Sequence, residues 1–214
     1  IKKRSITNKN KPLSPMIIAL IVIVVVAAVI GLISALVFLG EFAPFGDVTG
    51  SGNLVTRPES FSDFNAVDAE NGFNVEISKS DTYDIEVMAD DNVMEFVSVS
   101  KSGNTLKVGL EWGTKVNSAT LKIKIMMPDL QEIELSGGSK GEIEDFITSN
   151  SLSVDLSGGS QLSESGEAEY LTMDISSGSQ LDFSDYPVGD VNIELSGGSQ
   201  AIINLDGTLD ADLN

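Results

Sequence analysis

The chain contains 214 residues, with 32 acidic and 13 basic side chains and a formal net charge of −19 at pH 7. It has no cysteine and no histidine, which excludes disulfide bonds, thiolate metal sites and histidine as a general base. All the acids follow residue 40. This part of the chain therefore repels phosphate groups, and we expect it not to bind nucleic acid.

Residues 1–15 form a basic tail, and residues 16–39 form an uncharged run dominated by Ile, Val, Leu and Ala. As a helix rising about 1.5 Å per residue, this run would measure roughly 36 Å, and the hydrocarbon core of a bilayer is about 30 Å thick. We therefore expect one transmembrane α-helix that anchors the protein in the lipid bilayer of the cell membrane. The basic flank predicts a cytoplasmic N-terminus and an extracytoplasmic remainder.

A cleaved signal peptide and a buried core helix are the alternatives to a membrane anchor. A signal peptide has a shorter apolar run, of roughly 7–15 residues, and it ends in a small-x-small site. Ile33–Ala35 and Phe38–Gly40 both place a bulky residue within such a site. We therefore favour the anchor.

Residues 40–57 are rich in Gly, Pro and Ser, which predicts a flexible stalk. In residues 58–129, apolar residues recur at every second position, which is the period of half-buried strands. The clearest stretches are Phe73–Ile77, Tyr83–Val87, Thr105–Leu110 and Leu121–Ile125. We expect an all-β region here that caps the repeats that follow.

One phrase recurs at nearly constant spacing: an acid, an aliphatic residue and Ser-Gly-Gly-Ser, with Ser replacing the first Gly in the third copy. The copies are Glu134–Ser139, Asp155–Ser160, Asp174–Ser179 and Glu194–Ser199. A fixed period near 20 residues is typical of repeat proteins, in which each unit buries its apolar side against its neighbours. We expect residues 130–214 to form a β-solenoid with coils of about 20 residues. A further copy of the repeat begins at residue 209 and is cut short at residue 214. We therefore expect either that the chain is a fragment or that something caps its last coil.

Stacked coils would place like residues above one another, about 4.8 Å apart. The residues after each phrase are Lys140, Gln161, Gln180 and Gln200. The stacked Gln side chains can then hydrogen-bond along the axis, as amide ladders do. The acids would form a column that is the candidate metal site: Glu134, Asp155, Asp174 and Glu194.

Calcium is the ion that such a column would suit, because Ca²⁺ binds several carboxylate and carbonyl oxygens. The alternative is a solvated acidic face. Neighbouring charges at this spacing repel each other by only about 1 kcal/mol in water, which the fold can bear without a metal. We favour the solvated face and expect no cofactor.

No residue stands out as catalytic. The serines of the phrase lack a base, so we expect them to serve the turns. The acid pairs Asp90–Asp91 and Glu144–Asp145 are candidates for glycoside hydrolysis, but nothing in the sequence places either pair in a cleft. Trp112 could stack on a sugar ring, although we favour a place in the core or at a domain junction.

Several motifs after residue 48 occur in an order typical of one family. They are Thr49–Val55, Phe64–Val67, Gly72–Ile77, Ala89–Asn92, Pro128–Leu130 and the recurring Leu-Ser-Gly-Gly-Ser. On these motifs the chain, from about Gly50 to its end, resembles the family called putative auto-transporter adhesin, head GIN domain. The resemblance implies an all-β ectodomain with right-handed parallel β-helical coils that is exported or surface-exposed, and it implies no catalytic residue.

These observations together predict a membrane-anchored, surface-exposed module that binds or adheres without catalysis. A polysaccharide or an envelope protein is the expected partner, and the oligomeric state is open. A structural or sensory scaffold of the cell envelope is the first alternative, and a polysaccharide-active enzyme is the second.

Overall fold

The computed structural model describes residues 47–214, with the backbone alone at 145, 147–150 and 186. The expected tail 1–15 and the expected membrane helix 16–39 lie outside these residues, as does the first part of the expected stalk. Within the described residues, no helix is long and apolar enough to cross a membrane.

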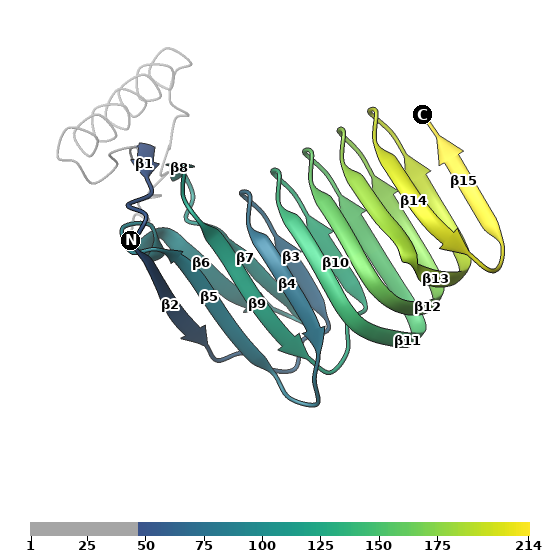
Figure 1. Ribbon diagram of the computed structural model, residues 1–214, viewed down its shortest axis with the longest axis horizontal. Helices are drawn as coiled ribbons and strands as arrows, with labels where there is room; N and C mark the ends of the chain where they lie inside the picture. Colours follow the sequence, from purple (N-terminus) through teal and green to yellow (C-terminus); the bar gives the residue numbers. More distant parts are fainter. Residues whose placement is uncertain (1–46) are drawn as a thin grey trace, which may run out of the picture. The chain divides into compact units, whose positions relative to one another are not determined.

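Thirteen strands of the described residues belong to one sheet, which doubles over to form two walls (Figure 1). Across the first wall the strands are β2 (Leu54–Glu59), β5 (Asp84–Asp90), β9 (Leu121–Met127), β4 (Asn74–Lys79), the first halves of β11 (Lys140–Leu156), β12 (Gln161–Ile175) and β13 (Gln180–Leu195), and β14 (Gln200–Leu205).

The second wall runs alongside the first. Its strands are β6 (Val97–Ser102), β7 (Thr105–Leu110), β3 (Ala66–Ala69), β10 (Glu132–Leu135), the second halves of β11, β12 and β13, and β15 (Leu209–Leu213). A 3₁₀ turn, η1 (Met94–Phe96), precedes β6. Apart from this sheet, β1 (Asp47–Thr49) pairs in parallel with β8 (Lys115–Asn117).

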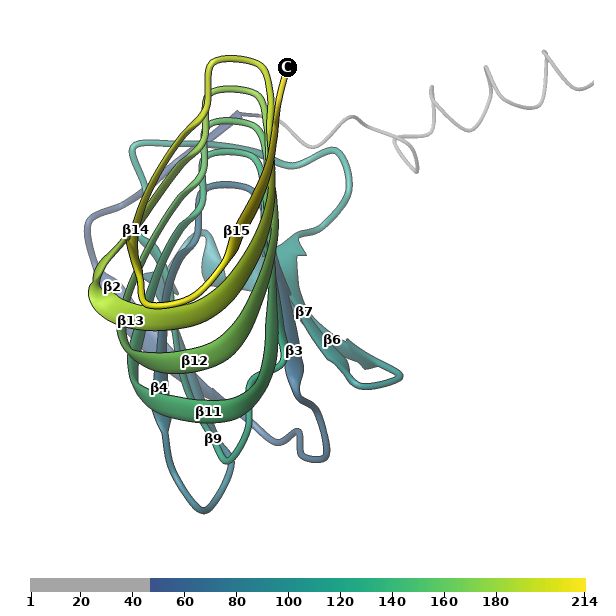
Figure 2. The same cartoon turned by 90° about the vertical axis from the view of Figure 1, so that its right-hand side faces the viewer.

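Three long strands join the two walls. β11, β12 and β13 have 17, 15 and 16 residues, and each bends in its middle so that its halves lie in opposite walls, as the nested curves of Figure 2 show. The register between β11 and β12 shifts at this bend. At the opposite side of the molecule, the Ser-Gly-Gly-Ser turns lead the chain from the second wall back to the first.

Parallel pairing in register builds the core. Leu135 pairs with Leu156, Leu156 with Ile175, Ile175 with Leu195, and Leu195 with Leu213. The first three members of this column are 0% exposed, because strands on both sides cover them, and Leu213 on the outermost strand is 69% exposed. The expectation that like aliphatic residues stack in one column is confirmed.

The backbone conformation of the turns favours glycine, although Ser177 takes the first glycine position in the third copy with a φ of +57°. In the second copy of the phrase, Gly158 and Gly159 have φ values of +64° and +78°, a region that residues with a Cβ atom rarely adopt. A Cβ atom on Gly158 would also lie 3.0 Å from the backbone nitrogen of Gly137 in the turn beneath. The turns therefore stack closely only where the first residue of the pair is small.

An additional copy of the repeat lies upstream of the four that the sequence displays. Asp68 pairs with Glu134, and the following Asn71 and Gly72 have φ values of +65° and +79°. These values match those of Gly137 and Gly138, which are +62° and +79°. The repeat thus begins at β3, although the Ser-Gly-Gly-Ser letters are absent there.

The expected fold class, a transmembrane α-helix followed by a right-handed parallel β-helix of uniform coils, is therefore corrected. The described chain is all-β, but its sheet is mixed: β2, β5 and β9 pair antiparallel, as do β6 and β7. The two-residue period shows which side chains of a strand are buried, but it does not show the direction of the neighbouring strand. Strands from residues 54–127 and 132–213 share one sheet, and whether the former cap the latter stays a prediction.

Replacement of Leu156 by Ala tests the aliphatic column. Because Leu156 is fully buried, we expect the Leu156→Ala variant to lose about 2–5 kcal/mol of unfolding free energy. Leu213→Ala alters the same column at its exposed member and should change the stability by no more than about 0.5 kcal/mol. Chemical denaturation of the full chain measures both, and equal losses would contradict the stacking order.

Candidate functional site

The predicted acidic column exists as a row on the outer face of the second wall. Glu134, Asp155, Asp174 and Glu194 occupy consecutive register positions on β10, β11, β12 and β13. The structure extends the row at both ends, with Asp68 on β3 and Asp212 on β15. Six acids therefore follow one another across six neighbouring strands.

Two acids of this row, Glu134 and Asp155, have a raised pKa. Partial burial raises the pKa of Glu134 most, and the charges of Asp68 and Asp155 raise it further. Partial burial likewise raises the pKa of Asp155, with additional contributions from Asp174 and Glu132. At the β7 side the row meets a cation, because Lys107 Nζ lies 2.6 Å from Asp68 Oδ2.

Among residues 47–214, no three acidic side chains are arranged to bind one metal ion. Acids one strand apart point away from the sheet in parallel rather than toward a common centre. The calcium site on the column stays a prediction.

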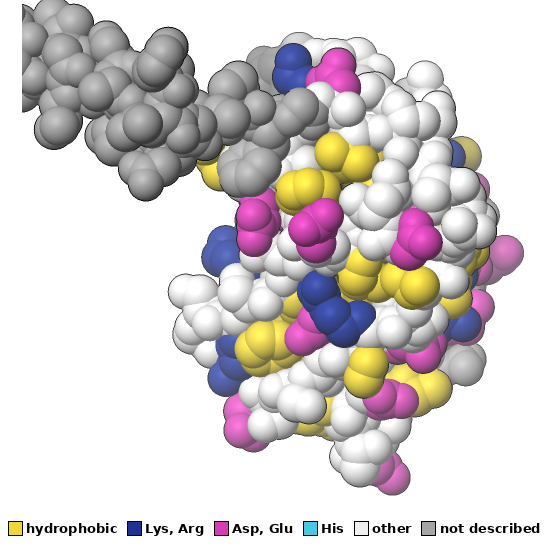
Figure 3. Space-filling view, turned by 90° about the vertical axis from the view of Figure 1, so that its left-hand side faces the viewer, with side chains coloured by type: hydrophobic (Ala, Val, Ile, Leu, Met, Phe, Trp, Pro, Cys, Tyr) yellow, Lys and Arg dark blue, Asp and Glu magenta, His cyan; other side chains and the backbone are white. Residues whose placement is uncertain are grey.

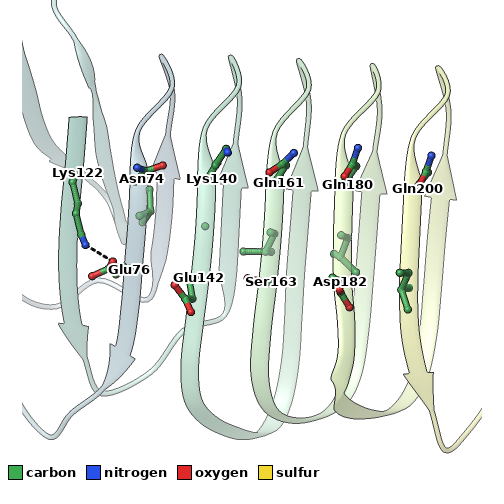
Figure 4. Close-up of a pocket in the computed structure, with 15 residues that line it drawn as sticks. Asn74, Glu76, Lys122, Lys140, Glu142, Gln161, Ser163, Gln180, Asp182 and Gln200 are labelled. Carbon is green, nitrogen blue, oxygen red and sulfur yellow. Dashed lines mark ion pairs between the residues drawn. The ribbon is translucent and has the colours of Figure 1, made fainter. Parts of the chain in front are cut away.

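A shallow groove crosses the outer face of the first wall, with a volume of about 470 Å³ (Figure 4). One side of the groove is a row of side chains that begin their strands: Asn74, Lys140, Gln161, Gln180 and Gln200. The other side is the row two residues further along: Glu76, Glu142, Ser163, Asp182 and Ile202. Register places each row across β4, β11, β12, β13 and β14. We call this feature the amide groove.

The glutamines of the amide groove are stacked but are not bonded to one another. Gln161 pairs in register with Gln180, and Gln180 with Gln200. Their backbone N–H groups donate to the carbonyls of the preceding turn, at 2.9–3.0 Å. The described residues contain no hydrogen bond between these side chains, so the expected amide ladder is wrong. The exposed amides keep their donors and acceptors for other groups.

Charges in the amide groove are largely compensated. Lys122 on β9 pairs with Glu76, and Lys124 lies 3.8 Å from the second oxygen of the same carboxylate. Hydrogen bonding by the Ser184 side chain, and then by its backbone N–H at 3.1 Å, lowers the pKa of Asp182. Among the groove residues on β12 and β13, Gln161, Ser163 and Gln180 are uncharged and Asp182 carries the one charge.

Sequence reasoning found only part of the amide groove. It identified the row from Lys140 to Gln200 by its place after each phrase, but it missed Asn74, Glu76 and Lys122, which come from the strands before the repeats. The sequence did contain a signal for Asn74. The turn pair Asn71-Gly72 precedes Asn74 at the same spacing as Gly137-Gly138 precedes Lys140, and the two pairs have nearly the same φ values. For Lys122 there was no signal, because its position depends on how β9 pairs with β4.

The serines that end each phrase serve the turns, as expected. Ser139, Ser160 and Ser179 are 0% exposed. The hydroxyl groups of Ser139 and Ser160 each donate to the carbonyl three residues earlier, at 2.8 Å. The Ser179 hydroxyl accepts the backbone N–H of Ser160 from the neighbouring turn at 3.2 Å.

The acid pair Asp90–Asp91 is occupied by the backbone and side chains around it. Asp90 is buried and accepts hydrogen bonds from the N–H groups of Gly52 and Thr120. Asp91 accepts from the Ser51 hydroxyl and from the N–H of Asn92. These contacts attach the segment before β2 to the sheet. Of the second pair, Glu144 is exposed and the Asp145 side chain is not among the described atoms.

Trp112 does not lie in the core or at a junction, which corrects the sequence-based preference. Its side chain is 93% exposed at a tight turn closed by a 3.1 Å hydrogen bond from the N–H of Thr114 to the carbonyl of Glu111. Gly113 supplies the positive φ of +85° that the turn needs. The sequence could not show this, because an aromatic residue at a strand end suits a core and a surface equally.

Basic side chains do not gather on the face drawn in Figure 3, where Lys and Arg are interspersed with acidic and apolar groups. Arg57 on β2 is held by neighbours: its guanidinium donates to the carbonyls of Met94 and Val97 and pairs with Glu59 at 2.7 Å. That nucleic acid is not a partner stays a prediction from the net charge.

The described residues form a mixed β-sheet protein with two polar outer faces. The chain belongs to the family described as putative auto-transporter adhesin, head GIN domain, which matches residues 63–214. The resemblance seen in the sequence is thereby confirmed. Among curated proteins, no match was found.

Three solved structures resemble the chain at low sequence identity, and the two with TM-scores of 0.50 and 0.53 share its fold. A putative adhesin from Bacteroides fragilis is 18% identical, with a TM-score of 0.50 over 77% of this chain and 100% of that chain. A putative lipid binding protein from Parabacteroides distasonis is 14% identical, with a TM-score of 0.53 over 79% of this chain and 99% of that one. A putative adhesin from Parabacteroides merdae is 16% identical, with a TM-score of 0.47 over 78% and 98%.

Replacement of Asp155 by Asn tests the electrostatics of the acidic row. The pKa of Asp155 is raised in the folded state, so folding loses stability as the pH rises from the unfolded pKa, near 4, through the folded pKa. At pH 7 we expect Asp155→Asn to be more stable than the parent by less than about 1 kcal/mol, because exposed charges interact weakly. Below about pH 4 the difference should vanish.

Asp182→Asn is the control of opposite sign. Hydrogen bonds to Ser184 lower the pKa of Asp182, so its charged form stabilises the fold above the unfolded pKa, and this contribution is lost as the pH falls through the folded pKa. We expect Asp182→Asn to be less stable than the parent at pH 7 and equal to it in acid. Denaturation curves between pH 3 and about pH 8 cover both transitions, and the same sign for the two variants would contradict this account.

Proposed function

We propose that this protein is a non-catalytic adhesion module of the cell surface, whose partner is a polysaccharide or an envelope protein. The observation that carries the proposal is the repetition of outward polar side chains in register: Gln161, Gln180 and Gln200 stand in one row on adjacent strands. Membership of a family described as adhesins and the fold shared with a solved structure described as a putative adhesin support it.

Repetition suits adhesion because a repeating partner can engage several equivalent groups at once. Each contact between an exposed amide and a ligand is weak, on the order of 1 kcal/mol. Once the first contact forms, the others become intramolecular, and total affinity rises steeply with the number engaged. A rigid sheet favours this, because its side chains need little ordering when the partner binds.

The chemistry of the described residues supports binding over catalysis. The chain has no histidine or cysteine, the turn serines Ser139, Ser160 and Ser179 are buried, and both carboxylates of Asp90–Asp91 already accept hydrogen bonds. Glycoside hydrolysis needs two carboxyl groups flanking one bond, with one of them kept protonated. The groups with raised pKa, Glu134 and Asp155, lie on the second wall, and neither of them lines the amide groove.

A binding screen that also detects cleavage tests this function. The full chain is applied to a panel of immobilised polysaccharides and purified envelope proteins, and the released reducing ends are measured in parallel. We expect retention on at least one ligand, growing steeply with ligand density, with no release of reducing ends. Cleavage would favour the enzyme, and absence of binding to every ligand would favour the scaffold.

A further inference from the structure

We propose that the amide groove of the first wall binds a linear, uncharged glycan that lies across the strands. The inference deepens the proposed adhesive function and rests on it. It assigns the binding to one wall of the molecule and names the chemical class of the ligand.

The shape of the groove fits a single extended chain. Its two rows are two residues apart along each strand, which corresponds to about 7 Å, and it crosses five strands, which corresponds to roughly 19 Å between the outer two. At about 470 Å³, it lies within the usual range for ligand sites of about 300–1,000 Å³. A polymer running perpendicular to the strands meets one new side chain of each row at every strand.

The hydrogen-bonding groups of the groove match hydroxyl groups. A glutamine amide offers two donors and one acceptor oxygen, and a sugar hydroxyl likewise donates and accepts. Gln161, Gln180 and Gln200 are exposed and make no side-chain hydrogen bond within the described residues. Ser163 faces Gln161 across the groove on the same strand and adds a hydroxyl. A polyhydroxylated chain can therefore satisfy each amide at successive strands.

The charges disfavour a charged polymer. Lys122 and Lys124 are engaged by Glu76, and on β11 Lys140 stands two residues from Glu142. The net charge of −19 repels a polyanion. A polycation would find three carboxylates along the groove, but it would also meet two lysines, and the central strands β12 and β13 offer it only Asp182. With a single charge on these two strands and both signs at the β4 and β11 end, the groove suits an uncharged ligand.

Lipids and extended peptides fit less well. The apolar lining residues Val75, Leu162 and Leu181 are 1–2% exposed, and the lining contains no aromatic residue. Ile202 on the outermost strand is the one exposed apolar side chain of the lining, at 56%, so a hydrocarbon chain finds apolar surface only at that end. An extended peptide adds to a sheet through unpaired backbone groups. The strands β4, β11, β12 and β13 are each paired on both edges, and β14 pairs with β13 alone among the described strands. A peptide could therefore add only beside β14, parallel to the strands and not along the groove.

A pair of matched double variants tests the assignment. Gln161→Ala with Gln180→Ala removes two adjacent amides from β12 and β13 in the first wall. Thr172→Ala with Asn192→Ala removes two exposed polar groups that pair in register on the same two strands in the second wall. The full-length parent and variants are titrated against a neutral glucan, a neutral mannan, a polyuronate and an amino glycan, and denaturation curves check that all three proteins fold.

We expect a neutral glycan to bind the parent and the second-wall variant equally and the groove variant about ten- to hundredfold more weakly, as the loss of two hydrogen bonds implies. If the second-wall variant alone bound more weakly, the glycan would not bind in the amide groove, but the proposed adhesive function would be retained. Binding restricted to the polyuronate or the amino glycan would overturn the ligand class. Binding to envelope proteins but to no glycan would overturn the inference and retain the adhesive function, whereas absence of binding to any ligand would refute both.

Discussion

Parallel pairing in register between successive repeats is the interaction on which the structure depends. It places Leu135, Leu156 and Ile175 in one buried column, so each aliphatic side chain is covered by the same residue type one strand away. The turns follow the same constraint, because Gly137 and Gly158 approach too closely for ordinary side chains. A slip of one residue would turn the aliphatic column outward and bury the acids beside it.

The same register produces two different outer faces. On the second wall it aligns six acids, and there partial burial and then the charges of neighbouring acids raise the pKa of Glu134 and Asp155. On the first wall it aligns Gln161, Gln180 and Gln200, whose uncharged side chains make no hydrogen bond within the described residues. One geometric rule therefore places neighbouring charges on one face and an array of exposed hydrogen-bonding groups on the other.

Much of the repeat region was predictable from the sequence. The period of about 20 residues indicates which residues stack, and the alternation of apolar and polar residues indicates which side chains face outward. The placement of the acid column, the buried aliphatic column and the turn serines followed from this. The bonded amide ladder, the core position of Trp112 and the uniform parallel fold did not hold. These three depend on side-chain orientation, on what packs beside a strand end and on strand direction, none of which a two-residue period encodes.

The sequence by itself determined the repeat, its spacing and the identity of the residues in each row, because identical local patterns impose the same turn and the same buried face. Only the tertiary structure decided that β4 and β9 continue the first wall. That pairing brings Asn74, Glu76 and Lys122 to the amide groove from strands without the repeated phrase. Contacts between segments far apart in the chain arise from sheet pairing, which many strands of similar pattern could form equally well.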